Sequence, residues 1–331
     1  MSLAATGIGS MPGDDAHAFD EALKVVLGEL PDLPHLPELP GRGAPADMTG
    51  RALAVMAELG ADLQPAGWRL TDAAGVDQRR ARSLLAQDLD AVEEQTQGYS
   101  GRFKVQVAGP WTLAATVERP RGDRVLADHG ARRELAQALA EGVREHVADV
   151  RRRIPGAEVV VQVDEPALPA VLAGQVPTAS GFHRHRSVDH PQASPALEWV
   201  FSAIREAGAL PLAHCCASDV PIDLLLGAGA GGVSVDLASL GPGGYDALAG
   251  ALERGHTVLL GVVPTREPAT VSDKALTERA HRFLDMVGLD PAGVAGRLVI
   301  TPSCGLAGAS PAWARRALDL SARVARNLSS L

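Results

Sequence analysis

The sequence is poor in residues that crosslink or stack. Its 331 residues include three cysteines, and aromatic residues make up 3% of the chain. A small, odd number of cysteines does not form a disulfide framework, so we expect reduced thiols and a cytoplasmic protein. With so few aromatic side chains, the core must be built from Ala, Val and Leu, a mixture that suits repeated packing of strands against helices.

Positive charge and long apolar segments are also scarce. The formal net charge is −9 at pH 7, whereas nucleic acids and anionic membranes bind clustered positive charge. No run approaches the roughly 20 apolar residues of a membrane span, and the N-terminus lacks the basic and apolar segments of a secretory signal. We therefore expect a soluble enzyme with a small-molecule substrate and with no nucleic-acid or membrane partner.

Apolar runs of strand length alternate with segments of helical periodicity. The run at 35–40 is a weak strand candidate because it contains prolines. Counting it, eight strands predict an α/β fold with a single (β/α)8 TIM barrel over residues 1–331. A doubly wound sheet is the alternative, but no Gly-x-Gly-x-x-Gly follows a strand. The expected strands span 6–12, 35–40, 103–110, 158–166, 211–217, 231–236, 257–263 and 298–305, and the expected helices 19–30, 49–59, 77–97, 124–153, 195–207, 273–287 and 310–327.

One apolar run ends in a histidine and two cysteines. Because side chains alternate along a strand, His214 and Cys216 share one face and Cys215 lies on the other. Two further strand ends carry Asp236 and Cys304. One His, two Cys and one carboxylate can satisfy tetrahedral Zn²⁺. Free cysteines are also common in cores, so these residues alone leave a zinc site and plain core packing both open.

Polar residues cluster where strands end. The active site of a (β/α)8 barrel lies at the carboxyl ends of its strands, so this placement predicts one site there. Glu165 is expected to hydrogen-bond a neighbouring strand end or the backbone of the site. The polar residues at strand ends are Ser10, Glu38, Asp164, Glu165, His214, Cys216, Asp236 and Cys304.

Seven short motifs occur in order across nearly the whole chain. Together they resemble the catalytic C-terminal domain of cobalamin-independent methionine synthase, within the superfamily that includes uroporphyrinogen decarboxylases. The resemblance implies a zinc-dependent methyltransferase that converts homocysteine to methionine. The motifs are Ile8-Gly-Ser10, Asp47-Met48, Gly109-Pro-Trp-Thr112, Gln162-Val-Asp-Glu-Pro-Ala167, His214-Cys-Cys216, Val233-Ser-Val-Asp236 and Pro302-Ser-Cys-Gly305.

The resemblance also implies a ligand set for the metal. His214, Cys216 and Cys304 match the family's zinc ligands, and Asp236 stands where the family usually has a glutamate. The chemistry fits these residue types, because a free thiol is mostly protonated at neutral pH and a coordinating thiol is deprotonated. A labile Asp236 would open a position on the metal for the substrate sulfur.

Four further residues match the family's substrate-binding parts. Ser10 and the neighbouring backbone, including Ile8, match the part that holds the substrate's α-carboxylate. Asp164 matches the acid near the α-amino group and is the expected catalytic residue. Glu38 corresponds, by a looser match, to a second acid that binds the amino group.

The methyl donor is open between a methylcorrinoid and methyltetrahydrofolate. Family enzymes protonate the folate with a histidine just after the strand matched here by 260–266, but this sequence has Thr265 and Arg266, neither a normal proton donor at pH 7. The aromatic residue expected after the Gly-Pro motif is replaced by 113–116, and these 331 residues hold no counterpart of the second, folate-binding barrel. A methylcorrinoid needs no such proton, so we favour it and keep folate as the alternative.

Three other functions compete with this one. A methyltransferase for another small thiol, such as coenzyme M, would share the zinc chemistry, but Ser10 and Asp164 favour an amino-acid thiol. A decarboxylase-like barrel would use arginines and an aspartate without metal, and the paired cysteines argue against it. A non-catalytic zinc-binding barrel is the third, because the acid histidine is missing.

Overall fold

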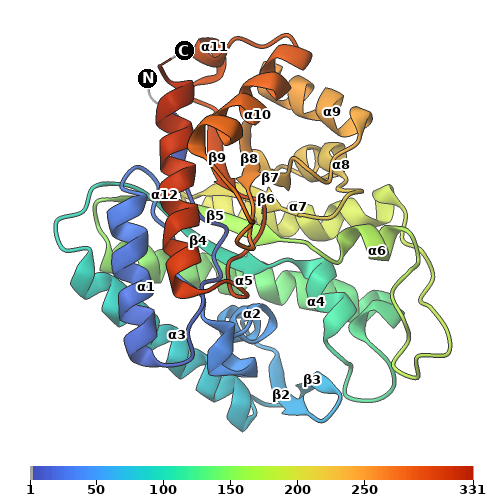
Figure 1. Ribbon diagram of the computed structural model, residues 1–331. Helices are drawn as coiled ribbons and strands as arrows, with labels where there is room; N and C mark the ends of the chain where they lie inside the picture. Colours follow the sequence, from blue (N-terminus) through green and yellow to red (C-terminus); the bar gives the residue numbers. More distant parts are fainter. Residues whose placement is uncertain (1–2, 331) are drawn as a thin grey trace.

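A curled parallel sheet forms the centre of the computed structural model, which describes residues 3–330 (Figure 1). Seven strands lie in the order β1-β9-β8-β7-β6-β5-β4. Their sequences are nearly continuous apolar runs, as expected for parallel strands that are buried on both faces. The strands are β1 (Ala4–Ala5), β4 (Gly101–Ala108), β5 (Ala157–Asp164), β6 (Leu210–His214), β7 (Gly232–Asp236), β8 (Thr257–Val263) and β9 (Leu298–Pro302).

Residues 35–38 take the eighth position and close the barrel between β1 and β4. His35 forms a parallel bridge with Lys104, and Glu38 forms one with Ser10. The Leu36 N–H donates to the Lys104 carbonyl over 2.8 Å. Proline at 34 and 37 has no N–H to donate, so this segment forms single bridges and no regular strand. The predicted (β/α)8 architecture is confirmed, with one irregular strand.

Helices surround the sheet (Figure 1). Several begin at a capping side chain; the Ser310 hydroxyl, for example, accepts from the Trp313 N–H at the start of the last helix. Among residues 3–330, no helix combines the length and apolarity that a membrane crossing requires. The helices are α1 (Ala16–Glu29), α2 (Met48–Val55), α3 (Val76–Gln95), α4 (Pro110–Thr116), α5 (His129–Arg153), α6 (Leu168–Leu172), α7 (His190–Glu206), α8 (Ile222–Gly227), α9 (Pro242–Glu253), α10 (Asp273–Met286), α11 (Pro291–Val294) and α12 (Pro311–Leu328).

Several elements differ from the sequence prediction. An antiparallel hairpin of β2 (Gly60–Gln64) and β3 (Gly67–Thr71) was missed, and its Trp68 is a buried core residue. The short α4 was missed because nearly all of its residues are buried, which leaves no apolar-polar period to detect. The expected helix over 124–153 begins at His129, because a 3-10 turn occupies Val125–Ala127.

The barrel interior changes from apolar to polar along the strands. A separate cluster inside the barrel consists of Ala4, Leu33, Val160, Leu212, Leu259 and Val299. Two residues further along the same strands, the side chain faces the same way and lies nearer the carboxyl end. There the inward positions carry Thr6, His35, Gln162, His214, Gly261 and Thr301. The apolar layer therefore plugs one end of the barrel, and polar side chains face the other.

Candidate metal and substrate site

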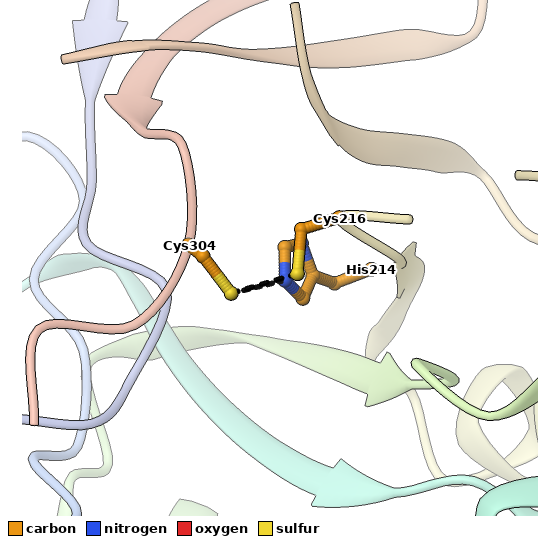
Figure 2. A group of neighbouring side chains, drawn as sticks. All are labelled: His214, Cys216 and Cys304. Carbon is orange, nitrogen blue, oxygen red and sulfur yellow. Dashed lines mark hydrogen bonds between the residues drawn. The ribbon is translucent and has the colours of Figure 1, made fainter. Parts of the chain in front are cut away.

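Two thiols and one imidazole converge at the carboxyl ends of β6 and β9 (Figure 2). The Sγ atoms of Cys216 and Cys304 are 2.8 Å apart. Cys304 Sγ lies 4.0 Å from His214 Nε2, although 90 positions separate the two residues. All three candidate ligand atoms lie within 4.8 Å of one another, so this group can hold a metal ion.

The strand end and its neighbour orient the imidazole. His214 is the last residue of β6 and is 4% exposed. Its Nδ1 lies 3.0 Å from the Ser234 hydroxyl on β7, which leaves Nε2 facing Cys304. A hydrogen bond to the far ring nitrogen is the usual way in which proteins orient a ligating histidine. No local sequence signal marks Ser234, because its role depends on the adjacent strand.

The two thiols share their hydrogen bond unequally. The hydrogen bond with Cys216 lowers the pKa of Cys304, and the contact with His214 lowers it further. The same hydrogen bond raises the pKa of Cys216. Burial raises the pKa of Cys215 to about 12, and this thiol lies outside the group, as strand alternation predicted. The lowered pKa of Cys304 favours its thiolate form, which suits a cation.

Asp236 does not join this group. It ends β7, and its carboxylate accepts from the Ala238 N–H over 2.9 Å and from the Ser239 hydroxyl over 2.8 Å. Aspartate often forms such bonds with a turn two residues ahead. Within residues 3–330, the close group consists of His214, Cys216 and Cys304 without a carboxylate. Ligation by Asp236 would require its carboxylate to move closer to this group.

A cavity of about 260 Å³ opens beside the metal-binding group. It joins the strand ends that sequence analysis singled out, so the predicted substrate residues and three predicted ligands face one space. Its lining includes Ile8, Ser10, Glu38, Asp164, His214, Cys216 and Cys304.

Ser10 is fastened to the loop that carries Cys304. Its carbonyl accepts from the Leu306 N–H over 2.8 Å. A Cβ atom built on Gly305 would lie 2.1 Å from Ser10 Oγ, so a larger residue at 305 would require the Ser10 hydroxyl to move. This close approach places the hydroxyl of Ser10 next to the metal-binding group.

Asp164 ends β5 and is 7% exposed. Its Oδ1 accepts from Gln162 Nε2 over 2.7 Å. The pKa of Asp164 is raised to about 7, chiefly by burial; the charge of Glu38 adds to the rise, whereas the charges of His214 and Lys104 oppose it. A cationic partner in the cavity would therefore stabilise the ionised form of this carboxylate.

Glu38 is paired with a buried arginine. Arg51 Nε lies 3.3 Å from Glu38 Oε1, and Arg51 Nη1 lies 2.7 Å from Asp88. Burial raises the pKa of Glu38, and the charge of Arg51 opposes this rise. Arg51 was not predicted; the only signal was an arginine directly before the apolar run at 52–55.

Glu165 faces the backbone, as the sequence predicted. Its Oε1 accepts from the Trp111 N–H over 2.9 Å, and its Oε2 accepts from the N–H and hydroxyl of Thr112, both over 2.7 Å. These bonds satisfy free N–H groups in the first turn of α4. Burial raises the pKa of Glu165 to about 7. Its role is to hold the start of α4 against the end of β5.

Comparison with known proteins identifies similar sequences and folds. The family model described as "Cobalamin-independent synthase, Catalytic domain" matches residues 96–327. No curated protein matches the chain. One similar solved structure is a B12-independent methionine synthase from Shewanella sp. W3-18-1 in complex with selenomethionine; it is 14% identical, with a TM-score of 0.68, over 100% of this chain and 98% of that chain. A β-mannanase from the blue mussel Mytilus edulis is 10% identical, with a TM-score of 0.49, over 98% of this chain and 92% of that chain.

Proposed function

The chain belongs to the cobalamin-independent methionine synthase catalytic-domain family, and we propose that it is a zinc-dependent methyltransferase that converts homocysteine to methionine. The observation that carries this proposal is the meeting of His214, Cys216 and Cys304 on one cavity with Ser10 and Asp164. A site with sulfur-binding and amino-acid-binding ends suits an amino-acid thiol.

The donor set supports zinc. One imidazole and two thiols within 4.8 Å of one another match the soft and borderline ligands that zinc prefers. Three protein ligands leave a fourth position for substrate, the usual arrangement of a catalytic zinc. When bound, zinc would deprotonate a coordinating thiol and so make the substrate sulfur nucleophilic at neutral pH. Asp236 remains a prediction as an exchangeable fourth ligand.

The other end of the cavity would orient the amino acid. We assign the α-carboxylate to the Ser10 hydroxyl and the neighbouring backbone, including Ile8. The α-ammonium goes to Asp164, whose Oδ1 is already bonded by Gln162 and whose second oxygen points to no partner within residues 3–330. Glu38 assists, but its charge is balanced by Arg51, so Asp164 is the stronger attractor.

The proposed donor is a methylcorrinoid, with methyltetrahydrofolate as the alternative. Arg266 is exposed and Thr265 half-buried in the loop after β8. Neither protonates an amine leaving group at pH 7. A methylcorrinoid requires no such proton, and the methyl group would pass to the homocysteine sulfur by in-line displacement.

A methyl-transfer assay tests the proposal. Purified protein is given homocysteine with each donor in turn, before and after removal of metal by a chelator. We expect methionine from one donor, loss of the activity with chelator and its return with added zinc. Absence of methionine with both donors, from protein loaded with zinc, would contradict the proposed function.

A further inference from the structure

A lysine lies inside the barrel. It is Lys104, two residues before the cavity-lining Gln106 on the same strand, and therefore farther from the cavity. Lys104 is on β4 and fully buried, whereas the other lysines of the chain, Lys24 and Lys274, are exposed. A buried ammonium is unfavourable unless its protons are bonded and a countercharge is near. The neighbouring residues of β4 are mostly apolar and cannot stabilise a charge, so other parts of the barrel must bond the ammonium group.

The three protons of the ammonium are used, all on neutral oxygens. Lys104 Nζ donates to the Ile8 carbonyl over 2.8 Å, to Gln162 Oε1 over 2.9 Å and to Gln106 Oε1 over 3.4 Å. Burial lowers the pKa of Lys104 to about 8, and the charges of Asp164 and Glu38 raise it. The countercharges of this ammonium are therefore the two acids of the cavity.

Gln162 connects the ammonium to one of these acids. Lysine can only donate hydrogen bonds, so the Gln162 amide must turn its oxygen toward Lys104. Its NH₂ group then faces the other way and donates to Asp164 Oδ1 over 2.7 Å and to the Ile8 carbonyl over 2.9 Å. With the amide reversed, an oxygen would face the carboxylate. Lys104 thus sets the orientation of the Gln162 amide, so that Asp164 faces its NH₂ group and not its oxygen.

We propose that Lys104 is a positioning residue that acts through Gln162 to orient the Asp164 carboxylate as the acceptor for the substrate's ammonium group. We call the hydrogen bonds from Lys104 to Gln162 and from Gln162 to Asp164 the relay. The relay occupies one carboxylate oxygen of Asp164 and leaves the other for the substrate, so it makes the site selective for a thiol that carries an amine. This inference rests on the proposed function, because it takes homocysteine as the substrate. It also predicts that Lys104 and Gln162 act as one unit.

Substitution of Lys104 by methionine, which keeps an unbranched side chain and removes the charge, tests the relay. In Lys104→Met we expect the KM for homocysteine to rise about tenfold, as for loss of one charge-assisted hydrogen bond. The KM for 4-mercaptobutanoate, which lacks the amine, should change little, and kcat and zinc content should stay close to wild type. Asp164→Asn sets the size of the loss when the acceptor itself is changed.

Gln162→Leu keeps the ammonium and breaks the connection, and it should cause the same loss of selectivity. The double variant should be no worse than either single variant, because residues of one unit are not additive. Lys24→Met, at an exposed lysine on α1, is the matched control and should leave both KM values unchanged.

Two results would overturn the inference: an unchanged preference for homocysteine in Lys104→Met and Gln162→Leu, or an equal loss for both thiols. If Lys104→Met does not fold, Gln162→Leu decides alone. Calorimetric binding of homocysteine and 4-mercaptobutanoate needs no methyl donor. Wild-type protein that binds homocysteine selectively but yields no methionine would count against the proposed function, while the variants would still decide the relay.

Discussion

At the scale of single residues, two adjacent cysteines have different places: Cys216 belongs to the metal-binding group and Cys215 does not. Cys216 and Cys304 meet at 2.8 Å, whereas Cys215 is buried outside the group. The alternation of side chains along an extended chain is enough to separate Cys215 from Cys216.

Cys304→Ser should therefore lose most of the bound metal, because a hydroxyl is a poor zinc ligand beside imidazole and thiolate. Wild-type protein should hold about one zinc per chain, as measured by metal analysis after dialysis. Cys215→Ser is the matched control and should keep its zinc. Full zinc content in Cys304→Ser would refute the assignment of the ligands.

At the scale of elements, the start of α4 is held against the end of β5 by a carboxylate that fits only beside a glycine. A Cβ atom at Gly109 would lie 2.3 Å from Glu165 Oε1. That carboxylate satisfies the first turn of α4, so its displacement would also leave buried N–H groups unpaired.

Gly109→Ala should accordingly lower the free energy of unfolding by about 1–3 kcal/mol, the usual range for overpacking a core. Gly28→Ala is a suitable comparison, because a Cβ atom at this position in α1 meets nothing within 4 Å. It should raise stability by about 0.5–1 kcal/mol through helix propensity. Urea denaturation measures both changes, and a stable Gly109→Ala would show that Glu165 can move without cost.

At the scale of the whole molecule, stability should depend on pH through a histidine distant in sequence from the metal-binding group. Burial lowers the pKa of His146, on α5, to about 4, and the nearby Arg51 contributes. Between this value and the ordinary value of 6.5, the unfolded chain binds a proton that the folded chain does not. Stability therefore falls as pH drops through this window.

The loss should approach about 3 kcal/mol near pH 4. His146→Leu should flatten the dependence of unfolding free energy on pH between about 4 and 6.5, measured by urea denaturation at several pH values. His256→Leu, which removes a half-buried histidine of the loop before β8, should leave the slope nearly unchanged. An unaltered slope in His146→Leu would contradict this assignment.

The architecture was predictable because its signals are local. Buried strands such as β5 are apolar runs with polar ends, and Ser310 with Pro311 marks the start of α12. The signals were absent for the short α4 and weak at 35–38, where the predicted strand is irregular. In those places the partners decide the conformation: His35 bridges Lys104 of β4 and Glu38 bridges Ser10, without forming a regular ladder.

The sequence by itself determined which strand ends carry imidazole, sulfur and carboxylate, because alternation and strand length are properties of consecutive residues. Only the tertiary structure decided that Cys304 meets His214 across 90 positions, that Asp236 turns into its own loop, and that Lys104 reaches Asp164 through Gln162. These contacts depend on closure of the barrel and on the register between strands, and both are set by pairing of segments that are far apart in the sequence.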